Sequence, residues 1–255
     1  MAELLFLGTG AADWEIKARN GFFRRNSAAL LDRKLLLDCG AHIFDFAAET
    51  GEADLYGGVT DILITHNHSD HVCPASVHAV AAGRKVRVLC SAAVRRRIGE
   101  DSAIEYLPLT PFTPCEMGGY RIMPVLANHD VVVTAEDAAV HYIIQTPDGK
   151  TLFYGLDGAW FLRPSWEEMK KYRFDLMVLD ATVGDRADWR IFEHNTIPML
   201  RMMAEEIKSR GMVAENGLLV ASHLARTLHA SPEETDAIMR RFGLLTATDG
   251  LCLTF

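Results

Sequence analysis

The sequence predicts an α/β fold with mixed layers, organised as one domain over residues 1–255. Two observations support this prediction. Short apolar strands begin to alternate with helices partway along the chain, and the last third is more helical than the rest. With 255 residues, 49% of them hydrophobic, the chain can bury a sizeable core. No internal repeat, low-complexity tract or Pro/Ser-rich linker divides the sequence.

The first third is predicted to be rich in β-strands. Short apolar runs that end in glycine or polar residues are typical of strands. They are LLFLG at 4–8, SAALLD at 27–32, KLLLDCG at 34–40 and DILITH at 61–66. Residues 12–26 form the least patterned stretch, and we expect a long loop there, near the mouth of a site.

A helix and further strands are predicted from residue 72 onward. Residues 72–83 have Pro74 in the first turn and Gly83 at the end, as helices commonly do, and KVRVLC follows as a strand. RIMPVLANHD, ending at residue 130, is another strand candidate. Residues 139–157 predict a hairpin, because the central PDG supplies turn chemistry.

The last third is predicted to contain three helices. SWEEMKKY is a short one. IPMLRMMAEEIKSRG has Leu200, Met203 and Ile207 at helical spacing, which predicts an amphipathic helix that packs on a sheet. SPEETDAIMRRFG opens with a capping box formed by Ser231 and Glu234, a strong signal for a helix start.

Composition narrows the classes of function. The net charge of −8 argues against long nucleic acids as partners and favours small substrates. Five scattered cysteines, none in a C-x-x-C pair, indicate neither a disulfide framework nor a cysteine-rich zinc site. The N-terminus lacks a basic region and no apolar run approaches roughly 18 residues, so we expect a cytoplasmic protein that binds no membrane. Self-association into a homo-oligomer is left open.

The segment LITHNHSDHV, residues 63–72, carries the strongest functional signal. His66, His68, Asp70 and His71 follow directly after an apolar strand. A strand that ends in a loop presents side chains at fixed positions, and imidazole and carboxylate are good ligands for Zn, Mn or Fe. A loop rich in histidine by chance is the alternative, but the H-x-H-x-D-H spacing favours a metal site.

This motif resembles the signature of the metallo-β-lactamase superfamily, and the resemblance covers nearly the whole chain. It implies an αββα four-layer sandwich with a two-metal site at one edge. It also implies later ligands, matched in order by His129 in VLANHD, Asp157 in LFYGLDG and His223 in LLVASHL. By that resemblance one metal is held by His66, His68 and His129, the other by Asp70, His71 and His223, and Asp157 bridges the two.

The residues alone leave an alternative for each later ligand. His129 could lie in a turn that caps a strand, and Asp157 could be an ordinary turn residue. A similar alternative applies to His223. All three follow β-like residues, however, so several strands could converge on one sheet edge. The histidines that lack a motif are left out of the metal site, namely His42, His78, His141 and His229.

A pair of divalent ions, Zn or Mn with Fe as a further option, makes hydrolysis the default reaction. Two metals lower the pKa of a bridging water to give hydroxide near neutral pH, and they neutralise an anionic substrate. Asp70 would then be essential to catalysis as well as a ligand.

Two segments resemble the phosphodiesterase branch of the superfamily, which contains ribonuclease Z and a phosphonate-linked cyclic phosphodiesterase. The first runs from FLGTGAADW to LLLDCG. The second, FEHNTIPMLRMMAEE, resembles the ribonuclease Z segment in which His-x-Thr precedes a helix, and this makes His194 the proton donor to the leaving oxygen. Histidine titrates near neutrality, so the role is chemically sensible. The alternative is a polar turn in which Asn195 or Thr196 caps the helix.

The segment SHLART resembles the final histidine segment of the same branch. Arg226 is a candidate phosphate contact, because guanidinium geometry matches phosphate oxygens; an ordinary surface arginine is the alternative. Two features depart from the branch. Positions 129 and 157 are too close for the projecting tRNA arm of ribonuclease Z, and the cysteine-rich zinc site of the phosphonate-linked enzyme is missing.

We therefore expect a binuclear metal-dependent phosphodiesterase that acts on a small phosphodiester. A carboxylic ester, thioester or lactone hydrolase of the glyoxalase II or lactonase type uses the same ligands, but the His194 segment weighs against it. A metal-binding protein without catalysis is the third option, and the complete ligand set weighs against that one.

Overall fold

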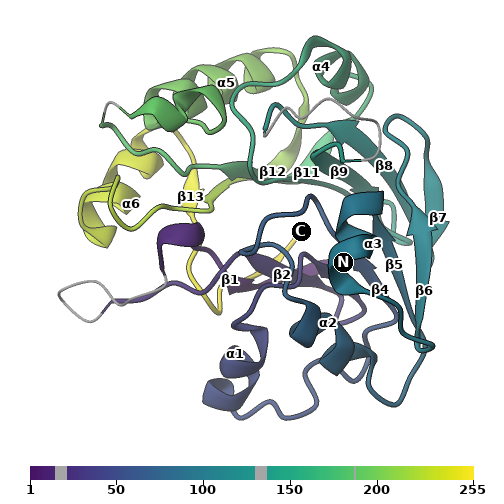
Figure 1. Ribbon diagram of the computed structural model, residues 1–255. Helices are drawn as coiled ribbons and strands as arrows, with labels where there is room; N and C mark the ends of the chain where they lie inside the picture. Colours follow the sequence, from purple (N-terminus) through teal and green to yellow (C-terminus); the bar gives the residue numbers. More distant parts are fainter. Residues whose placement is uncertain (15–21, 130–136, 187) are drawn as a thin grey trace.

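The computed structural model describes residues 1–14, 22–129, 137–186 and 188–255. Within them, the strands form two seven-stranded sheets that face each other, with helices on the outer side of each (Figure 1). The first sheet has the order β14-β1-β2-β3-β4-β5-β6, and the second has the order β13-β12-β11-β10-β9-β8-β7. These layers confirm the αββα sandwich that the resemblance implied.

The strands are short and most of their residues are buried. The first sheet contains β1 (Glu3–Gly8), β2 (Ala28–Leu31), β3 (Leu35–Leu37), β4 (Asp61–Leu63), β5 (Val86–Cys90), β6 (Ile104–Pro108) and β14 (Cys252–Thr254). The second contains β7 (Cys115–Met117), β8 (Tyr120–Leu126), β9 (Val140–Gln145), β10 (Thr151–Gly155), β11 (Phe174–Asp180), β12 (Val213–Ser222) and β13 (Leu245–Thr246).

Helices cover the two outer faces. The first sheet is covered by α1 (Ile43–Thr50), α2 (Pro74–Ala81) and α3 (Ala92–Ile98), and the second by α4 (Arg163–Met169), α5 (Ile197–Ser209) and α6 (Pro232–Arg241) (Figure 1). Two short 3-10 helices lie at Ala12–Trp14 and Trp189–Phe192. The four predicted helices therefore form, with ends that differ by a few residues from the sequence patterns.

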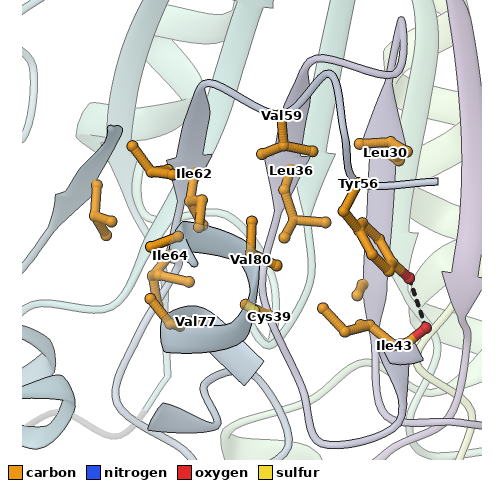
Figure 2. Packing of buried hydrophobic residues seen from close by; sticks show 14 of the residues in the cluster. Leu30, Leu36, Cys39, Ile43, Tyr56, Val59, Ile62, Ile64, Val77 and Val80 are labelled. Carbon is orange, nitrogen blue, oxygen red and sulfur yellow. Dashed lines mark hydrogen bonds between the residues drawn. The ribbon is translucent and has the colours of Figure 1, made fainter. Parts of the chain in front are cut away.

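Burial on both faces explains why the strands are continuous apolar runs. In β3, Leu35 and Leu37 belong to the core between the sheets, whereas Leu36 belongs to the outer core beneath the helices. Figure 2 shows Leu36 in that outer core together with Val77 and Val80 of α2. A sheet covered on both sides needs apolar residues on both, so alternation between apolar and polar residues disappears.

The predicted features of the last two helices are confirmed. Leu200, Met203 and Ile207 of α5 are buried in the outer core of the second sheet. At the start of α6, the Ser231 hydroxyl accepts a hydrogen bond from the Glu234 N–H, and the Glu234 carboxylate accepts one from the Ser231 N–H. These two hydrogen bonds satisfy backbone N–H groups at the helix start that have no partner within the helix.

Several elements were not expected from the sequence. They include α1, α3, the largely buried β11 and the C-terminal β14, which pairs with β1 through Leu4 and Leu253. In the expected loop at 12–26, Ala12–Trp14 forms a 3-10 helix, and residues 15–21 lie outside the described residues. The five cysteines are free. In the described part of the chain, no helix is long and apolar enough to cross a membrane.

Candidate metal centre

The predicted ligands follow the ends of strands that run in the same direction. Strand β9 is antiparallel to both β8 and β10, and β10, β11 and β12 are mutually parallel, so four strand ends lie at one edge of the second sheet. His129 follows β8, Asp157 follows β10 and His223 follows β12. The loop after β4 of the first sheet brings the other four, His66, His68, Asp70 and His71.

These seven residues gather into two groups that could each hold a metal ion. Within each group, one candidate ligand atom per residue lies within 4.8 Å of all the others. The first group is His66, His68, His129 and Asp157, and the second is Asp70, His71, Asp157 and His223. The structure thus brings together the residues that the resemblance assigned to each metal, and Asp157 is the member that both groups share.

The carboxylate of Asp157 divides its two oxygens between the groups. Its Oδ2 lies 3.3 Å from His66 Nε2 and 3.5 Å from His129 Nε2. Its Oδ1 lies 3.3 Å from His71 Nε2 and 2.9 Å from His223 Nε2. One carboxylate therefore faces both sets of imidazoles, which is the arrangement that a bridging ligand needs.

The spacing of these atoms fits divalent ions. Ligand atoms about 2.1 Å from a tetrahedral ion are about 3.4 Å from one another, and His71 Nε2 lies 3.1 Å from His223 Nε2. His68 Nδ1 and His129 Nε2 are also 3.1 Å apart. Buried polar atoms normally have hydrogen-bond partners, yet in the described residues His66 Nε2 has none. Convergent lone pairs that are shielded from water in this way suit a cation.

In the first sheet, Asp38 and Thr65 orient two of the candidate ligands. The Asp38 Oδ2 atom lies 2.8 Å from His71 Nδ1, and the Thr65 hydroxyl lies 3.0 Å from His66 Nδ1. Thr65 donates to Asp38 from both its N–H and its hydroxyl. Hydrogen bonds at the second ring nitrogen fix the orientation and tautomer of an imidazole, which leaves Nε2 directed at the metal position.

In the second sheet, Asp180 and Thr182 have a corresponding role. The Thr182 hydroxyl lies 2.7 Å from His223 Nδ1 and donates to Asp180 Oδ2 over 3.2 Å. The same carboxylate oxygen lies 2.7 Å from His194 Nδ1. Burial opposes a charge on His194, but the Asp180 carboxylate outweighs it and raises the pKa of that histidine above its ordinary value.

His194 lies beside both groups. It is 7% exposed, and its ring centroid is 4.8 Å from that of His129 and 5.7 Å from that of His223, on which it stacks. The helix cap is supplied by Thr196, whose hydroxyl accepts a hydrogen bond from the Met199 N–H. Capping and the placement of His194 are therefore separate features of this segment, and one does not exclude the other.

Electrostatics divide the imidazoles into two kinds. Burial lowers the pKa of His66 to about 4 and that of His129 to about 3, so both are neutral at pH 7, the form that ligates metals. Burial also acts against a charge on His223, but the carboxylates of Asp157 and Asp70 raise its pKa to about 10. The second group thus has the stronger negative field, because it contains two carboxylates.

Arg226 lies against the 3-10 helix near the N-terminus. Its backbone N–H donates to the Asp13 carboxylate, and its Nε donates to the Asp13 carbonyl over 2.9 Å. It lines a cavity of about 260 Å³ together with Trp14 and Leu224. Neither metal group includes it, and its role as a phosphate contact stays a prediction.

Four orienting residues were missed from the sequence, namely Asp38, Thr65, Asp180 and Thr182. Both aspartates come at or just after the end of an apolar strand, in LLLDCG and FDLMVLD. That is the same signal that drew attention to His66. No motif singles them out, because a lone aspartate after a strand is also common in turns.

The sequence matches a known protein family. Residues 33–243 match the β-lactamase superfamily domain, which is most of the chain. The chain belongs to the β-lactamase superfamily. No curated protein sequence matches it.

Solved structures of this superfamily share the fold over almost the entire length. The metallo-β-lactamase fold protein YhfI from Bacillus subtilis is 14% identical with a TM-score of 0.73, and the match covers 99% of this chain and 98% of that one. A diphosphatase from the PhnP family is 19% identical with a TM-score of 0.73, covering 100% and 98%. The short form of human tRNase Z is 17% identical with a TM-score of 0.70, covering 99% and 98%. At such identities the likeness shows the metallo-β-lactamase fold.

Proposed function

We propose that this superfamily member is a metal-dependent phosphodiesterase that acts on a small phosphodiester. The observation that carries the proposal is the position of His194 beside both ligand groups, with Asp180 behind it. An alkoxide leaving group needs a proton. A thiolate leaving group does not, so a thioesterase gains little from a buried histidine at this place.

Two divalent ions would be held by the two groups, with Asp157 between them. When bound, such ions activate water at neutral pH and neutralise the charge of a phosphate. We propose Zn or Mn, with Fe as a further option, since imidazole and carboxylate ligands suit all three. The proposed ligands are His66, His68 and His129 for one ion, Asp70, His71 and His223 for the other, and Asp157 for both.

His194 would supply the proton of the reaction. Hydrolysis adds water to phosphorus, breaks one P–O ester bond and releases an alcohol and a phosphomonoester. Because Asp180 holds Nδ1 of His194, Nε2 is the nitrogen left to give its proton to the departing oxygen. Asp180 also stabilises the charged imidazole before that transfer, so His194 stays protonated until it donates.

Three similar structures and the charge of the chain support this class of substrate. By name the structures are a diphosphatase, a tRNase Z and yeast PDE1; the last is 12% identical with a TM-score of 0.69 and a match that covers 100% and 99%. The net charge of −8 disfavours long nucleic acids, so a small molecule is the better partner.

Metal analysis beside a substrate screen tests the proposal. The purified protein should contain two equivalents of Zn or Mn by plasma mass spectrometry, and it should hydrolyse bis(p-nitrophenyl) phosphate faster than thioesters or lactones. His66→Ala serves as the control, because it removes one ligand. Turnover of thioesters or lactones alone would favour the glyoxalase II or lactonase type, and bound metal without any turnover would favour a non-catalytic protein.

A further inference from the structure

We infer that Asn128 and Asn195 are positioning residues that clamp the loop at 157–160 between the segments carrying His129 and His194. The inference rests on the proposed function in one respect, namely that Asp157 is a metal ligand. Neither asparagine belongs to the ligand groups, and each is the direct neighbour in sequence of a site histidine.

The loop at 157–160 has a backbone that its own residues do not favour. Trp160 has φ of 51°, in the left-handed region that bulky residues seldom adopt, and Asp157 has φ of 56° in the same region. Between them, a Cβ at Gly158 would come 2.8 Å from the ring of the buried His141, so a larger residue there would force that ring to move. Contacts from outside the loop must therefore hold this conformation.

Asn195 binds the loop at two points with one side chain. Its Oδ1 accepts a hydrogen bond from the Trp160 N–H at 2.8 Å, and its Nδ2 donates to the Gly158 carbonyl at 2.7 Å. The side chain is buried, with the residue 3% exposed. A backbone N–H can only donate and a carbonyl can only accept, so the two partners also fix which way the amide points.

Asn128 binds the middle of the loop from the other side. Its Nδ2 donates to the Ala159 carbonyl at 2.6 Å, and its own backbone carbonyl accepts from the Ala159 N–H at 3.1 Å. Asp180 completes the set by accepting the Gly158 N–H at 3.2 Å. Five backbone groups of the loop, three N–H and two C=O groups of residues 158–160, are thus hydrogen-bonded to the segments around the site.

This arrangement sets where the Asp157 carboxylate stands. Asn128 ties the loop to the segment of His129, and Asn195 ties it to the segment of His194. The carboxylate must place one oxygen in each ligand group, and displacements near 1 Å in a catalytic site cost roughly 10²-fold in rate. Loss of hydrogen bonds that orient metal ligands typically costs about 10- to 100-fold in metal affinity or activity.

The test compares Asn128→Ala, Asn195→Ala and the isosteric Asn195→Asp with a control variant, Ile207→Val. The Asn195→Asp substitution keeps the acceptor for the Trp160 N–H but loses the donor to the Gly158 carbonyl. Ile207 is buried in α5 outside the metal groups, and its shortening perturbs packing alone. Metal affinity is measured by competition with a chelator, stability by thermal unfolding, and kcat and KM on phosphodiesters with alkoxide-like and p-nitrophenolate leaving groups.

We expect both alanine variants to lose about 10- to 100-fold in metal affinity, and kcat to fall while KM changes little. Asn195→Ala should lose additional rate with alkoxide-like leaving groups, because it also loosens the His194 segment, whereas Asn128→Ala should affect both substrate types alike. The losses of metal affinity and kcat in Asn195→Asp should be close to those in Asn195→Ala. If an alanine variant does not fold, Asn195→Asp and the matching Asn128→Asp carry the test.

Metal affinity and kcat within twofold of wild type in the asparagine variants would overturn the inference. The inference would also be overturned if the asparagine variants lost no more metal affinity or kcat than Ile207→Val loses at an equal loss of stability. If the wild-type protein binds metal but hydrolyses no phosphodiester, the proposed function fails, while the chelator competition still tests the clamp.

Discussion

The two sheets support the candidate metal centre by the same device but to different extents. In each, an aspartate and a threonine meet at the edge where the ligands gather, Asp38 with Thr65 in the first and Asp180 with Thr182 in the second. The side chains of the first pair contact two candidate metal ligands, His66 and His71. The second pair contacts a ligand and also the residue that we propose as proton donor.

The difference lies in what Asp180 reaches. Besides His194, it accepts hydrogen bonds from the N–H groups of Gly158 and Asn195, so one buried carboxylate joins the loop after Asp157 to the donor segment. Asp38 has no such contact among the described residues. We infer that both sheets present metal ligands and that the second sheet also couples them to proton transfer.

The largest expected effect comes from a ligand in the first sheet's loop. Asp70→Ala should reduce phosphodiester turnover by roughly 10³-fold or more, because residues of a two-metal site act as a unit. The fold should persist, since Asp70 contacts His71 and His223 at the site and lies in none of the apolar cores. Turnover measured beside circular dichroism checks both statements. Undiminished activity in a folded variant would contradict the ligand assignment.

A paired substitution of the two aspartates tests the comparison itself. Asp180→Asn should slow substrates with alkoxide-like leaving groups by about 10²- to 10⁴-fold, because it disturbs the tautomer of His194. Asp38→Asn should lower metal affinity by about 10- to 100-fold. At saturating metal, it should affect alkoxide-like and p-nitrophenolate substrates alike.

Steady-state rates at several metal concentrations separate these two outcomes. An Asp38→Asn enzyme that shows the same dependence on leaving group as Asp180→Asn would remove the distinction between the sheets. So would an Asp180→Asn enzyme that is fully restored by added metal.

The smallest expected effect concerns a histidine in the first half that lies outside the centre. His78 Nδ1 lies 2.8 Å from Asp101, and this hydrogen bond, helped by the Ile98 carbonyl, raises the pKa of His78. A pKa that is raised on folding gives stability that is fully present below the unfolded value and is lost as pH rises through the folded value. His78→Ala should therefore lower the free energy of unfolding slightly at pH 5.5 and hardly at pH 9. Urea unfolding at both values measures this, and an equal loss at both would exclude the charge effect.

Local signals in the sequence predicted much of the fold. The capping box at Ser231 and the periodicity of Leu200, Met203 and Ile207 located two helices, because both signals arise from contacts between residues close in sequence. The C-terminal strand was not predicted, since Cys252–Thr254 becomes a strand only by pairing with β1 at the other end of the chain.

The site was predicted unevenly for a similar reason. His66, His68, Asp70 and His71 lie in one motif, and the later ligands were matched in order by the resemblance. Asp180 carries no motif, and two of its partners are distant in sequence. His194 lies 14 residues further along the chain, and Gly158 lies 22 residues back. The asparagines of the clamp carry none either, because asparagine is an ordinary residue of turns.

Hydrolysis by His194→Ala, measured with two leaving groups, tests the central claim most directly. If His194 protonates the departing oxygen, substrates with alkoxide-like leaving groups should slow by roughly 10²- to 10⁴-fold. Substrates that release p-nitrophenolate should lose far less, and metal content should stay unchanged. Equal losses on both substrates, or no loss on either, would contradict the account.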